Sequence, residues 1–252
     1  MNRRHALAVM LGLAGLLPFC SFGAPFPVFK IMTEQWNPYN YQENGEAKGL
    51  AVDVLVRMLE RVGSSQGRGD IHFFPWERGY QSAQQMSDVL LFSMTRTPER
   101  EARFKWVGPI ADNTIYLFAL KSRHIAIAAP AELKKYRIDT YIGAASEDVL
   151  VKEFGLRLED LDRSERQVST VQKIQLGRGD LFPASYPTLD RMCVELHCQR
   201  EVFEPVFPLS RAQLYYAFSK DTPDAVVTQL QSAFDTLKAE GVLGQIGRQY
   251  RQ

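Results

Sequence analysis

The segment Thr95-Arg-Thr-Pro-Glu-Arg100 combines hydroxyls, a proline and an arginine at a spacing suited to holding an anion. Thr97 followed by Pro98 predicts a helix start, with the Thr97 hydroxyl as cap and the proline in the first turn. Arg100 then lies in that turn, where a cation opposes the helix dipole by about 0.3–1 kcal/mol. A bound carboxylate would offset this unfavourable interaction, because the free N–H groups of the first turn and the guanidinium converge on the same carboxylate oxygens. Pairing with a neighbouring carboxylate such as Glu99 is an equally good explanation at this point.

A second group of candidates follows a predicted strand, in the segment Phe74-Pro-Trp-Glu-Arg-Gly-Tyr80. In open α/β sheets the loops after strands reach the cleft, so Trp76 and Arg78 could line a ligand site. Packing of Trp76 and surface pairing of Arg78 explain the same residues about as well. Tyr141, at the end of another predicted strand, could stack on a ligand or face the interior.

Cys193 and Cys198 lie close together in Cys-Val-Glu-Leu-His-Cys. In an oxidising compartment two nearby cysteines indicate a disulfide, and we predict one here. A metal site that includes His197 is the alternative, although the spacing is not a standard zinc pattern. The sequence carries neither a glycine-rich phosphate loop nor a nucleophile elbow. We therefore expect no cofactor, no metal and no catalytic group.

The N-terminal residues are predicted to be a secretion signal rather than part of the fold. Residues 1–5 are basic, residues 6–19 are apolar, and Ser21 and Gly23 are the small residues expected before cleavage after Gly23. An uncleaved anchor, or lipidation at Cys20, is the alternative. The formal net charge of +1 gives no reason to expect nucleic acid as a partner.

Strand-like and helix-like segments alternate along the rest of the chain. The expected strands are 28–32, 71–74, 88–92, 115–119, 138–142, 180–182 and 214–218, and the expected helices are 50–59, 77–86, 131–136, 143–154, 171–176, 188–196 and 225–250. The order β-α-β-α-β is the unit of a doubly wound sheet. Two such halves predict two lobes, residues 24–115 plus 209–252 and residues 116–208, joined by two β-rich segments.

Five motifs in this order resemble the family 3 extracellular solute-binding proteins, the polar-amino-acid receptors of ABC transporters. They are the opening MTEQWNPYNYQENGEAKGLAVDVL, the pattern Ser93, Thr95, Thr97 and Arg100, the segment YIGAASEDVL, the turn Gly177-Arg-Gly-Asp180, and LYYAFSKDTPDAVVTQLQSAFDTLKAEGVLGQI near the C-terminus. The resemblance covers nearly the whole chain after the leader. It implies a two-lobed type II periplasmic binding fold, with a doubly wound sheet in each lobe and two hinge strands, which closes on its ligand by hinge motion.

The resemblance also implies roles for individual residues. Arg100 would hold a ligand carboxylate, with the Thr95 hydroxyl and the backbone near Ser93. Other implied ligand contacts are Glu34 and Trp36 from the first lobe, and Ala145 and Ser146 at a helix start in the second. Receptors of this family bind the ligand's ammonium with an acidic residue, whose place is taken here by Ser185. The usual amino-acid clamp is therefore incomplete. Two explanations stay open: Glu34 or Glu77 supplies the charge from the first lobe, or the ligand lacks an α-amino group.

Taken together, these features predict a monomeric periplasmic receptor that delivers a small carboxylate-bearing solute to an ABC permease. Two alternatives remain open. One is a periplasmic enzyme resembling cyclohexadienyl dehydratases, which place a catalytic carboxylate near the position of Ser185. The other is a sensory module for a membrane signalling partner, which would need the same cleft and hinge.

Overall fold

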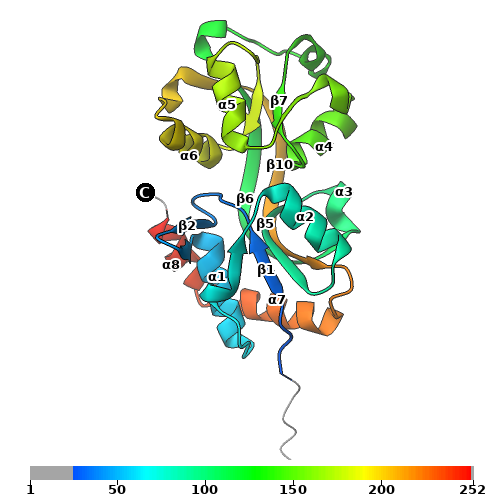
Figure 1. The fold of residues 1–252 in the computed structure, drawn as a ribbon, viewed down its shortest axis with the longest axis vertical. Helices are drawn as coiled ribbons and strands as arrows, with labels where there is room; N and C mark the ends of the chain where they lie inside the picture. Colours follow the sequence, from blue (N-terminus) through cyan, green and yellow to red (C-terminus); the bar gives the residue numbers. More distant parts are fainter. Residues whose placement is uncertain (1–24, 251–252) are drawn as a thin grey trace, which may run out of the picture.

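A computed structural model describes residues 25–250 and shows two α/β lobes, one above the other (Figure 1). The predicted leader, residues 1–23, and its cleavage after Gly23 lie outside the described residues. Within the described part of the chain, no helix is long and apolar enough to cross a membrane.

The expected strands appear in the expected order with changed bounds, and the structure adds three short strands that were not predicted, at residues 41–43, 46–48 and 162–164. The strands are β1 (Lys30–Thr33), β2 (Tyr41–Glu43), β3 (Glu46–Lys48), β4 (Ile71–Phe73), β5 (Val89–Arg96), β6 (Phe104–Leu120), β7 (Asp139–Tyr141), β8 (Asp162–Ser164), β9 (Phe182–Ala184) and β10 (Phe203–Ser219). The α-helices are α1 (Leu50–Arg61), α2 (Trp76–Gln85), α3 (Pro98–Glu101), α4 (Ala145–Lys152), α5 (Gln167–Gln175), α6 (Tyr186–Leu196), α7 (Asp224–Ala239) and α8 (Val242–Gln249). Residues 131–136, predicted as an α-helix, instead form part of a 3-10 helix, Pro130–Lys135.

The first lobe is built on a doubly wound sheet. β1 lies between β4 and β5 and is parallel to both, and β10 runs antiparallel to β5. Alternate side chains of β5 enter two different cores: Leu90 and Phe92 pack with α1 and α7, whereas Val89 and Leu91 pack with α2. This period of two is what a strand covered on both faces requires.

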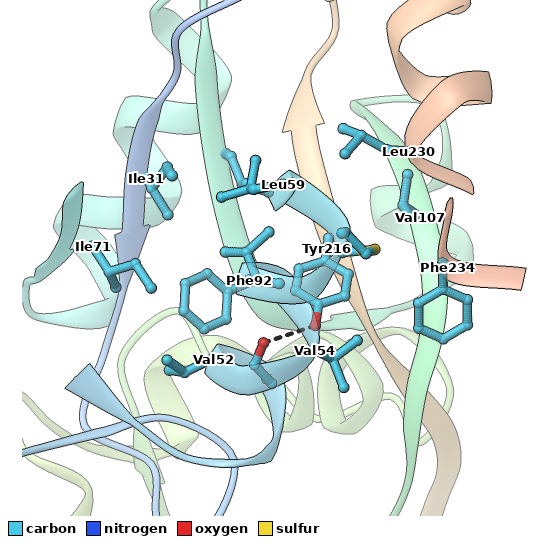
Figure 2. Packing of buried hydrophobic residues seen from close by; sticks show 14 of the residues in the cluster. Ile31, Val52, Val54, Leu59, Ile71, Phe92, Val107, Tyr216, Leu230 and Phe234 are labelled. Carbon is cyan, nitrogen blue, oxygen red and sulfur yellow. Dashed lines mark hydrogen bonds between the residues drawn. The ribbon is translucent and has the colours of Figure 1, made fainter. Parts of the chain in front are cut away.

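The larger core of this lobe forms between α1, α7 and the sheet (Figure 2). Apolar residues of α1 recur at helical spacing, so Val54, Leu55 and Met58 all face the sheet and are buried. The Tyr216 ring is fully buried among them, and its hydroxyl donates a 2.8 Å hydrogen bond to the Ala51 carbonyl. That bond satisfies the one polar atom that the tyrosine brings into an apolar core.

Two long strands connect the lobes. β6 and β10 pair antiparallel from Phe104 opposite Ser219 to Leu120 opposite Phe203. The predicted stretches 115–119 and 214–218 were too short, because polar residues such as Asp112 interrupt the apolar pattern between the lobes. Separate apolar clusters lie in the second lobe, around Leu117 and Phe118. The boundaries at 115/116 and 208/209 stay a prediction, since both strands run through both lobes.

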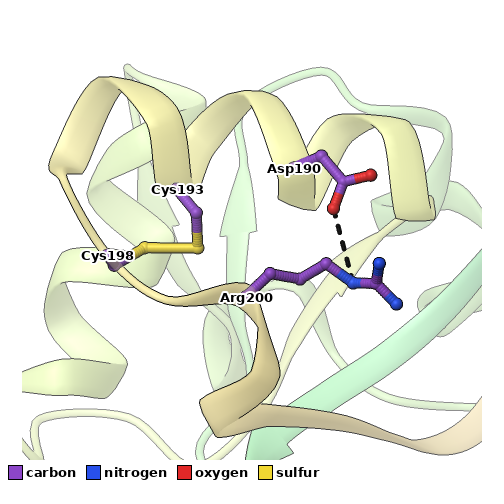
Figure 3. The surroundings of a disulfide bond; sticks show 4 residues. All are labelled: Asp190, Cys193, Cys198 and Arg200. Atoms are coloured by element: carbon purple, nitrogen blue, oxygen red, sulfur yellow. Dashed lines mark ion pairs between the residues drawn. A yellow bond between two sulfur atoms is a disulfide. The ribbon is translucent and has the colours of Figure 1, made fainter. Parts of the chain in front are cut away.

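The end of α6 carries a disulfide between Cys193 and Cys198, with a Cα–Cα distance of 4.5 Å (Figure 3). His197 takes a left-handed conformation, and the Cys198 N–H donates to the Cys193 carbonyl at 2.8 Å. This is a Schellman ending, in which the same two positions usually make an apolar contact. The disulfide takes the place of that contact. An ion pair between Asp190 and Arg200 joins the helix to the segment that follows.

Replacing Tyr216 by phenylalanine removes the side-chain hydrogen bond that supplements the helical bond of the Ala51 carbonyl, and is expected to lower the free energy of unfolding by about 1 kcal/mol. The matched control is Tyr215→Phe, because the Tyr215 hydroxyl bonds to the exposed Gln213 side chain rather than to a buried carbonyl. We expect this control to change stability by less than about 0.5 kcal/mol. Urea unfolding of the three proteins measures both effects, and equal stabilities for the two variants would contradict the prediction.

Candidate functional site

A cavity lies between the two lobes where their facing edges meet. It contains about 550 Å³ of atom-free space, part of it continuous with solvent. This size suits a small molecule rather than a peptide. The lining residues are Glu34, Trp36, Trp76, Ser93, Thr95, Arg100, Asn113, Ile115, Tyr141, Ala144, Ala145, Ser146, Gln167, Pro183, Ala184, Ser185 and Thr188.

Arg100 is the most deeply buried charged side chain of this cavity, with 1% of its surface exposed. Its Nη2 donates to the Gly143 carbonyl at 2.9 Å and its Nη1 to the Thr95 carbonyl at 3.5 Å. The guanidinium also lies 4.9 Å from the centre of the Tyr80 ring and 3.6 Å from the Asp148 carboxylate. Its Nε has no hydrogen-bond partner within residues 25–250. Burial lowers the pKa of Arg100, and the tyrosine and the aspartate partly offset this.

The helix around Arg100 differs from the prediction. Thr97 and Pro98 do begin it, but α3 has a single turn and the Thr97 hydroxyl makes no capping bond. The neighbouring carboxylates are engaged elsewhere: Glu101 pairs with Arg96, and Glu99 with Arg103 and Lys152. Surface pairing with these glutamates is therefore wrong as an account of Arg100. Backbone carbonyls of both lobes hold the guanidinium instead.

The strand before Arg100 presents its polar side chains through a bulge. Ser93 has no partner in β10, because Phe92 pairs with Tyr216 and Met94 with Tyr215. Its φ of 60° is unusual for a residue with a side chain and points to a constrained position. The buried Ser93 Oγ has no partner in the described chain. Two residues later, the Thr95 hydroxyl accepts from the Asn113 amide at 3.1 Å.

The second lobe faces Arg100 with the start of α4. Ala145 and Ser146 belong to its first turn, where N–H groups have no partner within the helix. The cap position is Ala144, so Ser146 is the second residue of the helix. Glu147 organises this turn instead, because its carboxylate accepts from the Gly143 N–H at 2.9 Å and pairs with Arg163.

Several hydrogen bonds cross the cleft and bring the two lobes into contact. The Gly143 carbonyl accepts from Trp76 Nε1 at 2.9 Å as well as from Arg100. Trp36 Nε1 donates to Thr188 Oγ1 at 2.9 Å. The Tyr141 hydroxyl donates to Glu34 at 3.2 Å. Each of these contacts joins residues that are far apart in sequence.

Glu34 is the one carboxyl group among the lining residues. Loss of hydration raises its pKa to about 7, and the Tyr141 hydroxyl and the charges of Arg191 and Arg100 oppose the rise. Near neutral pH this group therefore holds a proton in part of the molecules.

Ser185 caps a helix. Its Oγ accepts from the Thr188 N–H at 3.3 Å and lies 2.8 Å from Thr188 Oγ1. Both side chains are buried at the cavity wall.

Of the residues proposed from sequence, all but Arg78 lie at this cavity; the Arg78 guanidinium lies 4.6 Å from the centre of the Phe74 ring instead. Sequence reasoning missed Asn113, Gln167 and Thr188. Asn113 is in the middle of β6, in a polar stretch that was read as lying outside the strand. Gln167 is the first residue of α5, and Thr188 is the third residue of α6. Neither position carries a local sequence signal of ligand binding.

A family model described as bacterial extracellular solute-binding proteins, family 3, matches residues 29–252. The chain belongs to this family. The resemblance drawn from its motifs and the two-lobed fold are thus confirmed. A search of curated proteins finds no match.

Solved structures share the fold of this solute-binding protein at low sequence identity. One is a histidine kinase sensor domain with similarity to periplasmic binding proteins, with a TM-score of 0.74 and 13% identity over 89% of this chain and 96% of the other. Another is the arginine-, lysine-, histidine-binding protein ArtJ from Geobacillus stearothermophilus, with a TM-score of 0.74 and 15% identity over 89% and 95%. A third is the ancestral amino-acid-binding protein AncCDT-1, a precursor of cyclohexadienyl dehydratase, with a TM-score of 0.69 and 17% identity over 89% and 95%.

The raised pKa of Glu34 predicts a pH dependence of stability. The folded protein keeps a proton that the unfolded chain releases near pH 4.5, so the contribution of Glu34 to stability falls as pH rises from about 5 to 8. Glu34→Gln mimics the protonated form and removes this dependence. We expect the variant to match the ligand-free wild type near pH 5 and to exceed it in stability near pH 8. A stability difference that does not change with pH would contradict the assignment.

Gly143 predicts how closely the lobes can approach. Its φ is 74°, and a Cβ there would displace the movable end of the Glu77 side chain and press on the Trp76 ring, which is held in place by its bond to the Gly143 carbonyl. Gly143→Ala should therefore favour a more open form with a larger radius of gyration in solution scattering. Gly155→Ala is the matched control, because its φ is 66° and nothing lies within 4 Å of the new Cβ. Identical scattering by the two variants would show that this approach does not limit closure.

Proposed function

We propose that this protein is a secreted receptor that captures a small polar solute through a carboxylate and delivers it to an ABC permease. The observation that carries the proposal is the buried Arg100 guanidinium, which lines the cavity between the lobes and whose Nε–H has no partner in the described part of the chain. Arginine can bind a carboxylate with two parallel hydrogen bonds, and such pairs are strong when water is excluded.

The surroundings of Arg100 favour an anion at this place. Its two hydrogen-bond acceptors are neutral carbonyls, and the nearest carboxylate, Asp148, is 3.6 Å away and partly exposed. Taking a guanidinium out of water is unfavourable by several kcal/mol, and the ion pair with the partly exposed Asp148 carboxylate offsets only part of that cost. A ligand carboxylate would offset that cost. The first-turn N–H groups of Ala145 and Ser146 could bind the same oxygens from the second lobe.

The closed arrangement of the lobes supports binding of a ligand inside the cavity rather than on the surface of one lobe. Hydrogen bonds from Trp36 and Trp76 reach across the cleft, so a ligand in the cavity would be enclosed by both lobes. Two long strands provide the connection about which the lobes could open.

Membership of an extracellular family supports secretion to the periplasm, with the leader removed after about Gly23, and a monomeric receptor partnered by a permease. A sensory role would use the same cavity, as the similarity to a histidine kinase sensor domain suggests. Permease and ATPase genes beside this gene would support import, whereas a kinase or cyclase gene would support sensing. A catalytic role would need a carboxylate near Ser185, as in the dehydratases. Glu34 is the single carboxyl that lines the cavity in the described chain, and it belongs to the first lobe. We therefore infer binding without chemical conversion.

A thermal-shift screen of amino acids, hydroxy acids, dicarboxylates and, as a contrast, polyamines tests the proposal. A ligand at one hundred times its dissociation constant should stabilise the wild type by about 2.7 kcal/mol. For the best carboxylate, Arg100→Lys keeps the charge but loses the planar fork, so affinity should fall roughly tenfold or more, and Arg100→Ala should lose more still.

The control for this screen is Arg57→Ala, since Arg57 pairs with Glu60 on the exposed face of α1. Its affinity for the same ligand should equal that of the wild type. Unchanged affinity in Arg100→Ala, or a response to polyamines alone, would overturn the proposed carboxylate anchor.

A further inference from the structure

The cavity wall opposite the first lobe contains a pair of buried hydroxyls, Ser185 and Thr188. Trp36 Nε1 donates to Thr188 Oγ1 at 2.9 Å, the two hydroxyl oxygens are 2.8 Å apart, and the Thr188 N–H donates to Ser185 Oγ at 3.3 Å. Only 3% of Ser185 and 1% of Thr188 is exposed, and both line the cavity. The pair is therefore a fixed part of the wall.

The hydrogen-bonding capacity that remains to this pair can be counted. Two hydroxyls bring two hydrogens and four lone pairs. The bond between them uses one hydrogen and one lone pair, whichever oxygen donates, and the Trp36 and Thr188 N–H groups use two more lone pairs. One O–H and one lone pair remain for a ligand. The pair thus offers one donor and one acceptor, and carries no charge.

Apart from Arg100 Nε, the other buried polar side-chain atoms of the wall that lack partners among the described residues are also neutral. The Asn113 amide donates to Thr95, which leaves its buried Oδ1 free, and Ser93 Oγ has no partner among the described residues. The charge of Glu34, where it is ionised, already faces the cations Arg191 and Arg100 and the Tyr141 hydroxyl. The second lobe thus presents no carboxylate to a ligand cation in this cavity.

From this count we infer that the ligand is a hydroxy acid, whose hydroxyl binds the Ser185–Thr188 pair while its carboxylate binds Arg100. A hydroxyl brings one hydrogen and accepts another, which matches the lone pair and the O–H that remain. An ammonium brings three hydrogens and a charge, and would face an O–H with no counter-charge beside it. A ligand that has hydrogen in place of the hydroxyl would leave the donor and the acceptor of the Ser185–Thr188 pair unsatisfied. This inference rests on the proposed carboxylate-binding function.

Matched sets of probes that differ in one substituent test the inference by calorimetry. One set is L-lactate, L-alanine and propionate; others are L-3-phenyllactate, L-phenylalanine and 3-phenylpropionate, and L-2-hydroxyglutarate, L-glutamate and glutarate. In the set that binds best, we expect the hydroxy acid to bind roughly tenfold or more tightly than either companion.

Two variants then assign the preference to the pair. Ser185→Asp adds a carboxylate at this point and should shift the preference toward the amino acid by at least roughly tenfold. Ser185→Asn is the matched control, because asparagine has the size of aspartate without its charge. This variant should still bind the hydroxy acid more tightly than the amino acid. Both Asp and Asn are good helix caps, so α6 should fold in each variant.

The outcomes separate this inference from the function on which it rests. Tightest binding of an amino acid by the wild type, lost in Glu34→Gln, would make Glu34 the ammonium acceptor and overturn the hydroxy-acid inference alone. An unchanged preference in Ser185→Asp would overturn the role of the pair. Failure of every probe to bind would overturn the proposed function, and the inference with it.

Discussion

Taking the Arg100 guanidinium out of water is unfavourable by several kcal/mol, and the contacts that offset this come from both lobes. Thr95 contributes a carbonyl from the first lobe and Gly143 a carbonyl from the second. When the lobes separate, Arg100 loses Gly143 and becomes hydrated. When they close, the Gly143 carbonyl and the Asp148 carboxylate of the second lobe offset part of the cost, and a ligand anion would offset more. Closure and anion binding are therefore coupled through one side chain.

That coupling requires a connection that bends without breaking the sheet. β6 and β10 supply it, because they pair continuously from one lobe to the other. Their register shifts near Pro205, Pro208 and Leu214, and each shift marks a local bulge or irregularity in the ladder. Bulges bend strands and disrupt pairing locally, so they make this ribbon easier to deform than a regular one. The polar residues that obscured the strands in the sequence lie in this same region.

Local signals in the sequence predicted the parts that depend on periodicity and turn chemistry. Apolar spacing located α1, and the Thr97-Pro98 pair located the start of α3. The sequence could not reveal the bulge at Ser93, because it is defined by the pairing of β5 with β10. Nor could it pair Trp36 with Thr188, since 152 residues separate them. The family pattern identified Arg100 as a candidate. Its contact with the Gly143 carbonyl could not be predicted, because that contact forms only when the two lobes are closed.

The two walls of the cavity differ in chemistry. The first lobe contributes both lining groups that carry charge near neutral pH, Arg100 and Glu34. The second lobe contributes neutral groups: hydroxyls, an amide, and the backbone at the start of α4. Charge attraction acts over a distance and tolerates imperfect placement, whereas neutral hydrogen bonds weaken steeply with poor geometry. The first lobe is thus suited to capture a solute, and the second to admit closure only around one whose donors and acceptors fit.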